Sequence, residues 1–183
     1  MILTRSEIIK NIESGKIQIK TFDKSKVGVN SYDATLGKTL YIVYPNIYRE
    51  DYPYQDIKQP TEYEVIEIPK NGLIIYPGEL YLGVTNEWTY TPYHVPMYDG
   101  RSSVGRVGIR SHQTAGFGDV GFSGHWTLEI DVVIPTIIYP NMPIGQFSFH
   151  VPFGEVEKYN GKYINEFSET PLPVISNLRT KIK

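Results

Sequence analysis

The sequence predicts a single domain that is mainly β. At 183 residues it fits the usual size of one domain with its own core. The 16 Gly, 13 Pro and 15 Tyr residues are spread along the chain, which is typical of many short strands joined by turns. We find no internal repeat, low-complexity block or linker, so we expect one domain over residues 1–183.

One helix is predicted at the start of the chain. Thr4 stands where a helix N-cap is expected, with Glu7 at the N3 position, and Leu3 and Ile8 have the spacing of a hydrophobic staple. The helix should run to about residue 14 and end at Gly15. Its isoleucines form one apolar stripe, which favours packing on a sheet.

The remaining chain alternates short apolar runs with turn residues. We expect strands at 40–44, 63–68, 73–76, 80–85, 126–134 and 144–150, in a meander or jelly-roll arrangement. The strand at 126–134 is the clearest, because apolar residues alternate there with polar ones. Residues 44–61 predict a long loop. Residues from about 155 to 183 predict a tail that lies over another surface.

Composition excludes several classes of function. The chain has no cysteine, so it has no disulfide, no thiolate nucleophile and no Cys-containing zinc site. A net charge of -2 with scattered Lys and Arg argues against a nucleic-acid polymer as partner. The start MILTRSEIIKN turns polar at once, and no apolar run approaches the roughly 18 residues of a membrane span. We therefore expect a cytoplasmic protein with no membrane partner.

The segment DGRSSVGR, residues 99–106, has the composition of an anion site. A Gly turn is followed by Ser102 and Ser103, which suit the start of a short helix, and Arg101 and Arg106 flank them. Backbone N–H groups, hydroxyls and guanidinium groups together can bind phosphates. The alternative is an ordinary capped helix with surface arginines, and the pattern alone leaves both open.

The segment TAGFGDVGFSG, residues 114–124, has four glycines around a single carboxylate, Asp119. Glycines let a backbone approach a ligand closely, and Phe117 and Phe122 can line a flat ring. Asp119 can then hold a sugar hydroxyl or a water. The alternative is a plain hairpin whose Asp satisfies the amides of the turn.

Glu129 is the third candidate, on the polar face of the 126–134 strand beside Thr127 and Asp131. A carboxylate there suits a general acid and base, while the alternative is the solvated outer face of an edge strand. The four histidines show no HxH or HExxH spacing, so we expect no metal site built by the protein.

Taken in order, these segments resemble the dCTP deaminase family of the dUTPase superfamily. The resemblance rests on GRSS-x-x-R at 100–106, on the TAG-x-x-D-x-G-F-x-G turn and on the TLE strand with Glu129. It extends to ILTRSEI near the start, to NSYD and LG at 30–37, to IGQ at 144–146 and to GKY at 161–163. Three departures are Gly118 in place of a branched apolar residue, Val120 in place of Pro and Glu166 in place of Gln.

The resemblance implies a distorted, jelly-roll-like β-barrel of the dUTPase type with an N-terminal helix and one short internal helix. It also implies a homotrimer with active sites shared between subunits. Glu129 and Asp119 would be catalytic, and the tail would close over the site. The residues implied in binding the substrate are Arg101, Ser102, Ser103, Arg106, Thr114, Ala115, Phe117, Thr127, Tyr159, Lys162 and Glu166.

The implied reaction is the deamination of dCTP without zinc, with Mg²⁺ bound only through the substrate phosphates. Glu129 would deprotonate a water for attack on cytosine C4, and Asp119 would align a water on the α-phosphorus. Gly116 and Phe117 resemble the bifunctional members that form dUMP, since members that stop at dUTP carry His and Arg there. The other hypotheses are a deaminase that stops at dUTP, a dUTPase without deaminase activity, and a nucleotide-sensing module on the same fold.

Overall fold

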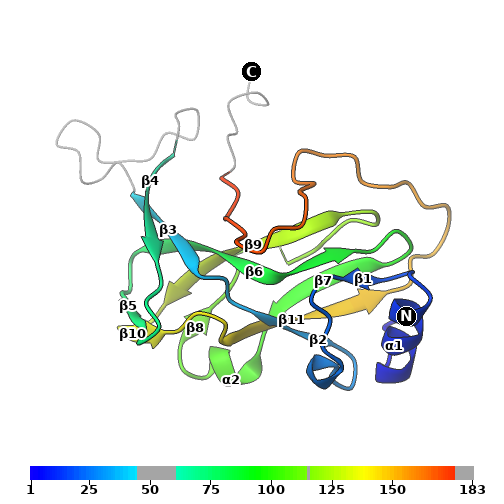
Figure 1. Cartoon of the computed structure of the whole chain (residues 1–183), viewed down its shortest axis with the longest axis horizontal. Helices are drawn as coiled ribbons and strands as arrows, with labels where there is room; N and C mark the ends of the chain where they lie inside the picture. Colours follow the sequence, from blue (N-terminus) through cyan, green and yellow to red (C-terminus); the bar gives the residue numbers. More distant parts are fainter. Residues whose placement is uncertain (45–60, 115, 176–183) are drawn as a thin grey trace.

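The computed structural model describes residues 1–44, 61–114 and 116–175 of the chain (Figure 1). The expected loop at 44–61 therefore lies almost wholly outside the described residues. The helical elements are α1 (Arg5–Glu13), the 3-10 turn η1 (Lys24–Lys26) and α2 (Ser102–Gly105). The strands are β1 (Gln18–Ile19), β2 (Tyr32–Thr35), β3 (Thr39–Tyr44), β4 (Glu62–Glu67), β5 (Leu73–Ile75), β6 (Leu80–Tyr90), β7 (Val95–Gly100), β8 (Ile109–Arg110), β9 (Ser123–Val132), β10 (Thr136–Ile138) and β11 (Pro143–His150).

The strands form three antiparallel sheets. The largest has the order β4-β3-β6-β9-β8, with β1 joined to β6; a second has the order β2-β11-β7, and β5 pairs with β10. Figure 1 shows the second sheet below β6 and β9, with α1 at one end of the molecule and the β5–β10 pair at the other. The expectation of a mainly β fold with an N-terminal helix and a short internal helix is confirmed, although the described sheets do not close into a continuous barrel.

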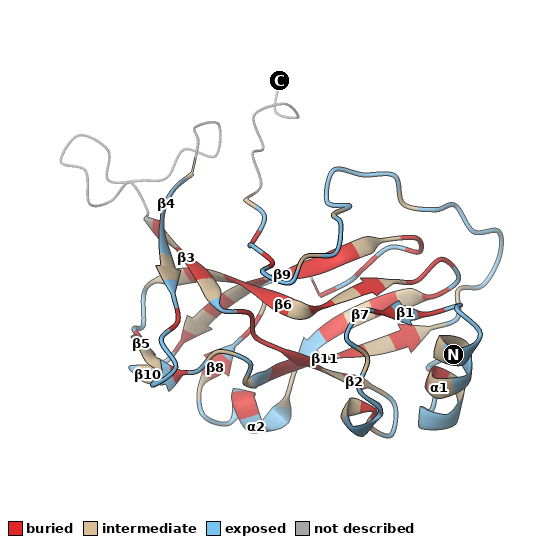
Figure 2. Cartoon of the chain, in the orientation of Figure 1, coloured by how far each residue is buried: buried red, intermediate tan, exposed pale blue. Residues whose placement is uncertain are grey.

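The core lies between the two larger sheets (Figure 2). Along β9 the side chains of Trp126, Leu128, Ile130 and Val132 are buried and the residues between them are partly exposed, as the alternating sequence predicts. The strand ends at Val132 instead of residue 134, because the next two residues leave the ladder and are exposed. Phe147 and Phe149 of β11 complete the core from the facing sheet.

The N-terminal helix forms where it is predicted. Thr4 is the N-cap residue, and Leu3 and Ile8 are both buried. The predicted side-chain cap is wrong, however: the Thr4 hydroxyl lies 3.2 Å from the Ser6 hydroxyl and makes no hydrogen bond to a helix amide. The helix ends at Glu13, and Gly15 has a φ of +74°, which glycine adopts without strain.

The six predicted strands are all present, with shifted ends, but five others are missed. The missed strands are β1, β2, β7, β8 and β10. They have two to six residues each, too few for an alternating pattern to stand out from the turns around them. Neither described helix is long and apolar enough to cross a membrane.

A buried carboxylate, that of Glu87 in β6, ties β6 to the second sheet. Its side chain is 0% exposed, and its oxygens accept hydrogen bonds from the backbone N–H and the hydroxyl of Thr35 in β2, each at 2.8 Å. Lys26 of η1 forms a 2.8 Å ion pair with it from a position that is 28% exposed. Nearby, burial raises the pKa of Tyr32 to about 12, with a further contribution from the Glu87 charge, so its hydroxyl stays protonated where it accepts the Asp23 N–H.

Replacing this carboxylate should destabilise the fold strongly. Glu87→Ala removes the acceptor of a buried amide and the partner of a half-buried lysine, so we expect the free energy of unfolding to fall by about 3 kcal/mol. Urea unfolding at fixed protein concentration measures it. Glu67→Ala, at an exposed position of β4, is the matched control and should change the free energy by less than about 0.5 kcal/mol. Equal losses in the two variants would contradict this role for Glu87.

Candidate active site

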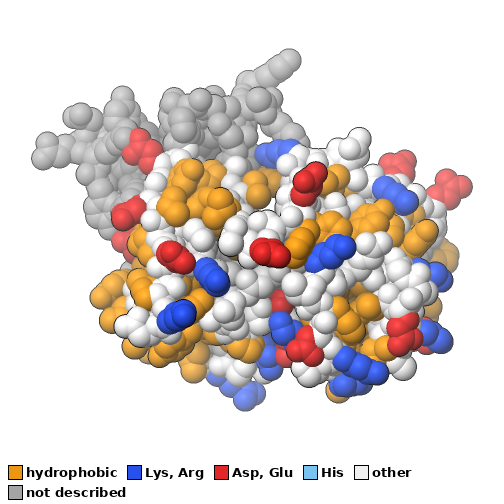
Figure 3. All heavy atoms as spheres, in the orientation of Figure 1, with side chains coloured by type: hydrophobic (Ala, Val, Ile, Leu, Met, Phe, Trp, Pro, Cys, Tyr) orange, Lys and Arg blue, Asp and Glu red, His pale blue; other side chains and the backbone are white. Residues whose placement is uncertain are grey.

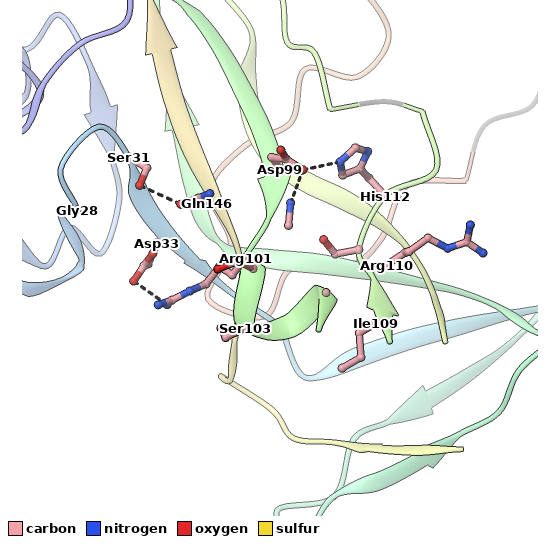
Figure 4. Close-up of a pocket in the computed structure, with 14 residues that line it drawn as sticks. Gly28, Ser31, Asp33, Asp99, Arg101, Ser103, Ile109, Arg110, His112 and Gln146 are labelled. Atoms are coloured by element: carbon pink, nitrogen blue, oxygen red, sulfur yellow. Dashed lines mark hydrogen bonds and ion pairs between the residues drawn. The ribbon is translucent and has the colours of Figure 1, made fainter. Parts of the chain in front are cut away.

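The larger cavity, of about 870 Å³, opens at the end of the second sheet beside α2 (Figure 4). Arg101, Ser102 and Ser103, three of the predicted phosphate ligands, line it. They lie there because β7 ends at Gly100 and the chain turns directly into the one-turn helix α2. The other lining residues are Gly28, Ser31, Asp33, Asp99, Gly100, Gly105, Ile109, Arg110, Ser111, His112 and Gln146.

Arg101 is held in this cavity by an ion pair. Its Nη1 donates to Asp33 Oδ2 at 2.7 Å, and both side chains are about one-third exposed. Asp33 belongs to β2, whereas Arg101 follows β7, so the ion pair spans the β2-β11-β7 sheet (Figure 4). Arg106, predicted as a ligand too, caps the end of α2 at an exposed position and does not line the cavity.

Several polar groups of this cavity were not predicted from the sequence. Gln146, the ladder partner of Asp33, has its Oε1 3.0 Å from the Ser31 hydroxyl. His112 Nε2 lies 3.3 Å from Asp99 Oδ1. Both Asp33 and Gln146 belong to stretches that carry the family resemblance, so the resemblance could have indicated them as site residues. Only the antiparallel pairing of β2 with β11 shows that the two face one cavity.

Glu129 lies on the polar face of β9, next to the segment that leads from this cavity to the Gly-rich turn. Its Oε2 accepts the backbone N–H of Gln113 at 2.9 Å and of Thr114 at 3.4 Å. Thr114, expected to bind the substrate, is therefore next to Glu129, and Ala115 lies outside the described residues. Because two amides fix one carboxylate oxygen, the other is available to a water or a substrate. Glu129 is not among the residues that line the Arg101 cavity of the same chain.

Asp119 lies in a second, smaller cavity of about 350 Å³. Phe117 and Asp119 of the Gly-rich turn form one side of it, and Tyr159 of the C-terminal segment lies on the other. Gly118 lies against Trp126 and Pro96: an added Cβ would be 2.5 Å from the indole and 3.0 Å from the Pro96 carbonyl oxygen. Glycine is thus required here, which gives the first of the departures from the family pattern a physical reason.

The other predicted ligands lie along the tail or beside it. Thr127 accepts the backbone N–H of Val174 at 2.8 Å through its hydroxyl. Lys162 Nζ lies 4.9 Å from the ring centroid of Tyr163, and Glu166 is exposed. Arg106, Lys162 and Glu166 line neither cavity. Most of the predicted site residues therefore lie in three places on one chain: the Arg101 cavity, the Glu129 face and the Asp119 cavity.

Charge over the molecular surface is mixed. Figure 3 shows acidic and basic side chains interspersed on the face in view, with no continuous basic patch. Across residues 1–44, 61–114 and 116–175, no three His, Asp or Glu side chains gather closely enough to hold a metal ion. Any cation at this site would need further ligands from the substrate.

His125 is a buried, neutral histidine behind the Glu129 face. Its Nδ1 donates to the Thr85 carbonyl oxygen at 3.0 Å, so its Nε2 is the acceptor for the Ser168 N–H at 3.1 Å. Burial lowers the pKa of His125 from 6.5, and burial lowers that of His94 as well. A protonated imidazole would lose the hydrogen bond from Ser168.

This histidine should make stability depend on pH. Because its folded-state pKa is below about 6.5, the unfolded chain binds the proton first. The contribution of neutral His125 to the free energy of unfolding is therefore complete above about pH 6.5. It is lost as the pH falls toward the folded-state pKa. We expect the free energy of unfolding to decrease from pH 7 to pH 5, with a smaller slope in His125→Gln. Urea unfolding at several pH values measures the slope, with His150→Gln as control. An unchanged slope in His125→Gln would contradict the assignment.

Among solved structures, a deoxycytidine triphosphate deaminase shares this fold. The structure superposes on the "Crystal structure of 2'-deoxycytidine 5'-triphosphate deaminase from Agrobacterium tumefaciens" with a TM-score of 0.64 and 20% identity, over 82% of this chain and 48% of that chain. The chain thus spans about half the length of that protein. At this identity the likeness concerns the fold.

The family follows from the sequence comparisons. Residues 2–151 match the family model described as dCTP deaminase-like. The chain is 50% identical over 166 residues to the "dCTP deaminase, dUMP-forming" of Clostridium beijerinckii, with 90% of this chain and 91% of that protein covered. It is 45% identical over 164 residues to the protein of the same name from Leptospira biflexa, with 89% and 90% covered. The chain belongs to the dCTP deaminase-like family.

Proposed function

We propose that this protein deaminates dCTP and also hydrolyses the triphosphate, so that its products are dUMP, ammonia and pyrophosphate. The observation that carries the proposal is the anchored carboxylate of Glu129, which accepts the backbone N–H groups of Gln113 and Thr114. These two residues directly follow His112, which lines the Arg- and Ser-lined cavity. The names of the relatives, all dUMP-forming dCTP deaminases, favour the bifunctional reaction over one that stops at dUTP.

The Arg101 cavity is the place for the triphosphate. A guanidinium group and two serine hydroxyls supply donors matched to phosphate oxygens. The ion pair with Asp33 fixes the direction of the Arg101 side chain before any ligand binds. Mg²⁺ would bind through the substrate phosphates and would neutralise part of their charge. Asp33 and Asp99 are the carboxylates that line the same cavity.

Glu129 serves as the general base and acid of deamination. Its free oxygen takes a proton from a water as the water oxygen bonds to cytosine C4 and the electron pair of the C4–N3 double bond moves to N3. The same carboxyl group then gives the proton to the 4-amino nitrogen. The N3 electron pair restores the C4–N3 double bond as the bond from C4 to the amino nitrogen breaks, and ammonia leaves. Transfer of the remaining hydroxyl proton from O4 to N3 gives the uracil ring. The amides of Gln113 and Thr114 hold the carboxylate in place throughout. Zinc deaminases use a metal held by His and Cys for this activation, and this chain has no Cys.

Asp119 serves the second reaction. A carboxylate in a cavity walled by Phe117 and Tyr159 can align a water on the α-phosphorus. The water oxygen bonds to phosphorus, the bond to the bridging oxygen breaks, and pyrophosphate leaves with the β- and γ-phosphates. The ring of Phe117 is 63% exposed in the single chain, which suits a contact that only a ligand or another subunit completes.

Two substitutions should separate these reactions. Glu129→Gln keeps the size of the side chain but cannot take a proton, so ammonia release from dCTP should fall at least about 100-fold. Asp119→Asn should lower pyrophosphate release while ammonia release continues. Phosphorus NMR with dCTP or dUTP and Mg²⁺, and an ammonia assay in the same samples, measure both. Ammonia release that survives Glu129→Gln would contradict the mechanism. An intact triphosphate in the wild-type product would show that the protein is a deaminase that stops at dUTP. Turnover of dUTP alone would show that it is a dUTPase.

We further propose that the active protein is a homotrimer whose sites join the Arg101 cavity of one subunit to the Glu129 face of another. Glu129 does not line the Arg101 cavity of its own chain, and this supports the arrangement. Glu129 and Arg101 would then belong to different chains in every site. Location in the cytoplasm, expected from the sequence, stays a prediction.

Shared sites predict complementation between two inactive variants. Arg101→Ala and Glu129→Gln should each be inactive alone. Co-expressed in equal amounts, they should recover about a quarter of wild-type activity, because one in four neighbouring pairs supplies both intact residues. The ammonia assay on co-purified mixed trimers measures the recovery, and separately expressed variants combined after purification are the control. No recovery in mixed trimers would show that each site belongs to one chain.

A further inference from the structure

The segment that follows β11 returns along β9 and is held there mainly by one residue, Asn165 (Figure 1). The Asn165 Oδ1 accepts the His125 N–H at 2.7 Å and its Nδ2 donates to the His125 carbonyl oxygen at 3.2 Å. Its backbone N–H donates to the Ser123 carbonyl oxygen at 3.0 Å, and its own carbonyl oxygen accepts the Trp88 Nε1–H at 2.8 Å. The side-chain amide therefore takes the place of a neighbouring strand's peptide group at an edge of β9.

The surface of β9 is shaped for this residue. A Cβ added at Gly124 would lie 2.4 Å from Asn165 Nδ2 and 2.8 Å from its Cγ, and these are the nearest atoms to that position. Real Cβ atoms do not approach that closely. Only glycine at 124 leaves room for the asparagine, so the two residues form a matched pair.

Contacts on either side of Asn165 extend the attachment. Downstream, the Phe167 ring stacks on His125 with centroids 5.8 Å apart, and Ser168 donates to the same imidazole. Upstream, Tyr159 donates its N–H to the Val120 carbonyl oxygen at 2.7 Å, and Lys158 lies against Gly121.

The upstream part of this segment is also a wall of the Asp119 cavity. Residues 155–159 line that cavity together with Phe117 and Asp119. These residues lie between the end of β11 and Asn165. The segment that forms the wall is therefore held at one end by the sheet and at the other end by Asn165. Loss of the Asn165 side chain removes its two hydrogen bonds to His125. The backbone hydrogen bonds of Tyr159 and Asn165, and the contacts of Phe167 and Ser168 with His125, remain.

We propose that Asn165 is a positioning residue: its insertion at Gly124 docks the C-terminal segment on β9 and so holds the tail side of the Asp119 cavity. It touches none of the reacting atoms and acts through the position of residues 155–159. Its consequence for catalysis rests on the function proposed above, in which Asp119 serves pyrophosphate release. The docking itself is a property of the free protein.

Docking is tested on the full-length protein without substrate. In Asn165→Ala the backbone amides of residues 159–168 should exchange with deuterium about tenfold faster, the change expected when the two side-chain hydrogen bonds to His125 are lost. Trypsin should also cleave after Lys158 and Lys162 about tenfold faster. Asn160→Ala, at an exposed asparagine of the same segment, is the matched control and should match wild type. Asn165→Asp should resemble Asn165→Ala, because a carboxylate oxygen would face the His125 carbonyl oxygen. Exchange and cleavage unchanged in Asn165→Ala would overturn the proposal.

A double-mutant cycle distinguishes the matched pair from general damage to β9. Gly124→Ala should loosen the tail in wild type but have little further effect in the Asn165→Ala background, where the clashing atoms are gone. Additive effects would show that Gly124 acts elsewhere.

With dCTP, Asn165→Ala should lower pyrophosphate release about tenfold and ammonia release less, as the amides that hold Glu129 do not involve the tail. Equal loss of both products would overturn the positioning role even if the exchange result stands, and absence of activity in wild type would refute only the proposed function.

Discussion

Glu87 lies in the irregular stretch of β6 between Val84 and Trp88, where the ladder with β9 changes register, and its carboxylate is shielded from solvent. A charged group in such a place is tolerated only when every oxygen is satisfied. Lys26 and Thr35 supply the partners, from η1 and β2. The charge therefore fixes the distance between the two sheets at one point, and removing a partner would leave a buried ion uncompensated.

The same irregular stretch organises both sides of the site. Two residues before Glu87, the Thr85 hydroxyl donates to the Glu87 carbonyl oxygen and accepts the Trp126 N–H, while the Thr85 carbonyl oxygen accepts from His125. On the other side, Thr35 lies two residues after Asp33, the partner of Arg101. One bulge in the ladder thus sets the position of β2 beneath the Arg101 cavity and of β9 beneath the tail. Bulges are common next to functional sites because they redirect side chains without breaking the sheet.

The sequence predicts those parts of the site whose pattern is local. The alternation along β9 places Glu129 on a polar face, and the Gly, Ser and Arg sequence predicts a turn and a one-turn helix with donors around it, as found. Glu87 was not predicted, because a glutamate in the run LGVTNEWTY has the pattern of an ordinary outward-facing residue. Its burial depends on Lys26 and Thr35, which lie 61 and 52 residues away. Asn165 was missed for the same reason: an exposed-looking tail gives no periodic signal, and its partner glycine is 41 positions earlier in a motif already explained by turn chemistry.

The two carboxylates of the proposed mechanism depend on different parts of the chain. Glu129 is fixed by amides of the segment just before the Gly-rich turn, so its geometry follows from the sheet and that turn alone. Asp119 faces a cavity half of which is tail, and the tail is attached by an asparagine, a neutral histidine and a few backbone hydrogen bonds. Segments with few buried contacts open more readily than core strands. In the proposed mechanism, the two reactions would therefore differ in what can weaken them. Deamination would depend on the stability of the sheet, whereas pyrophosphate release would depend in addition on whether the tail stays docked.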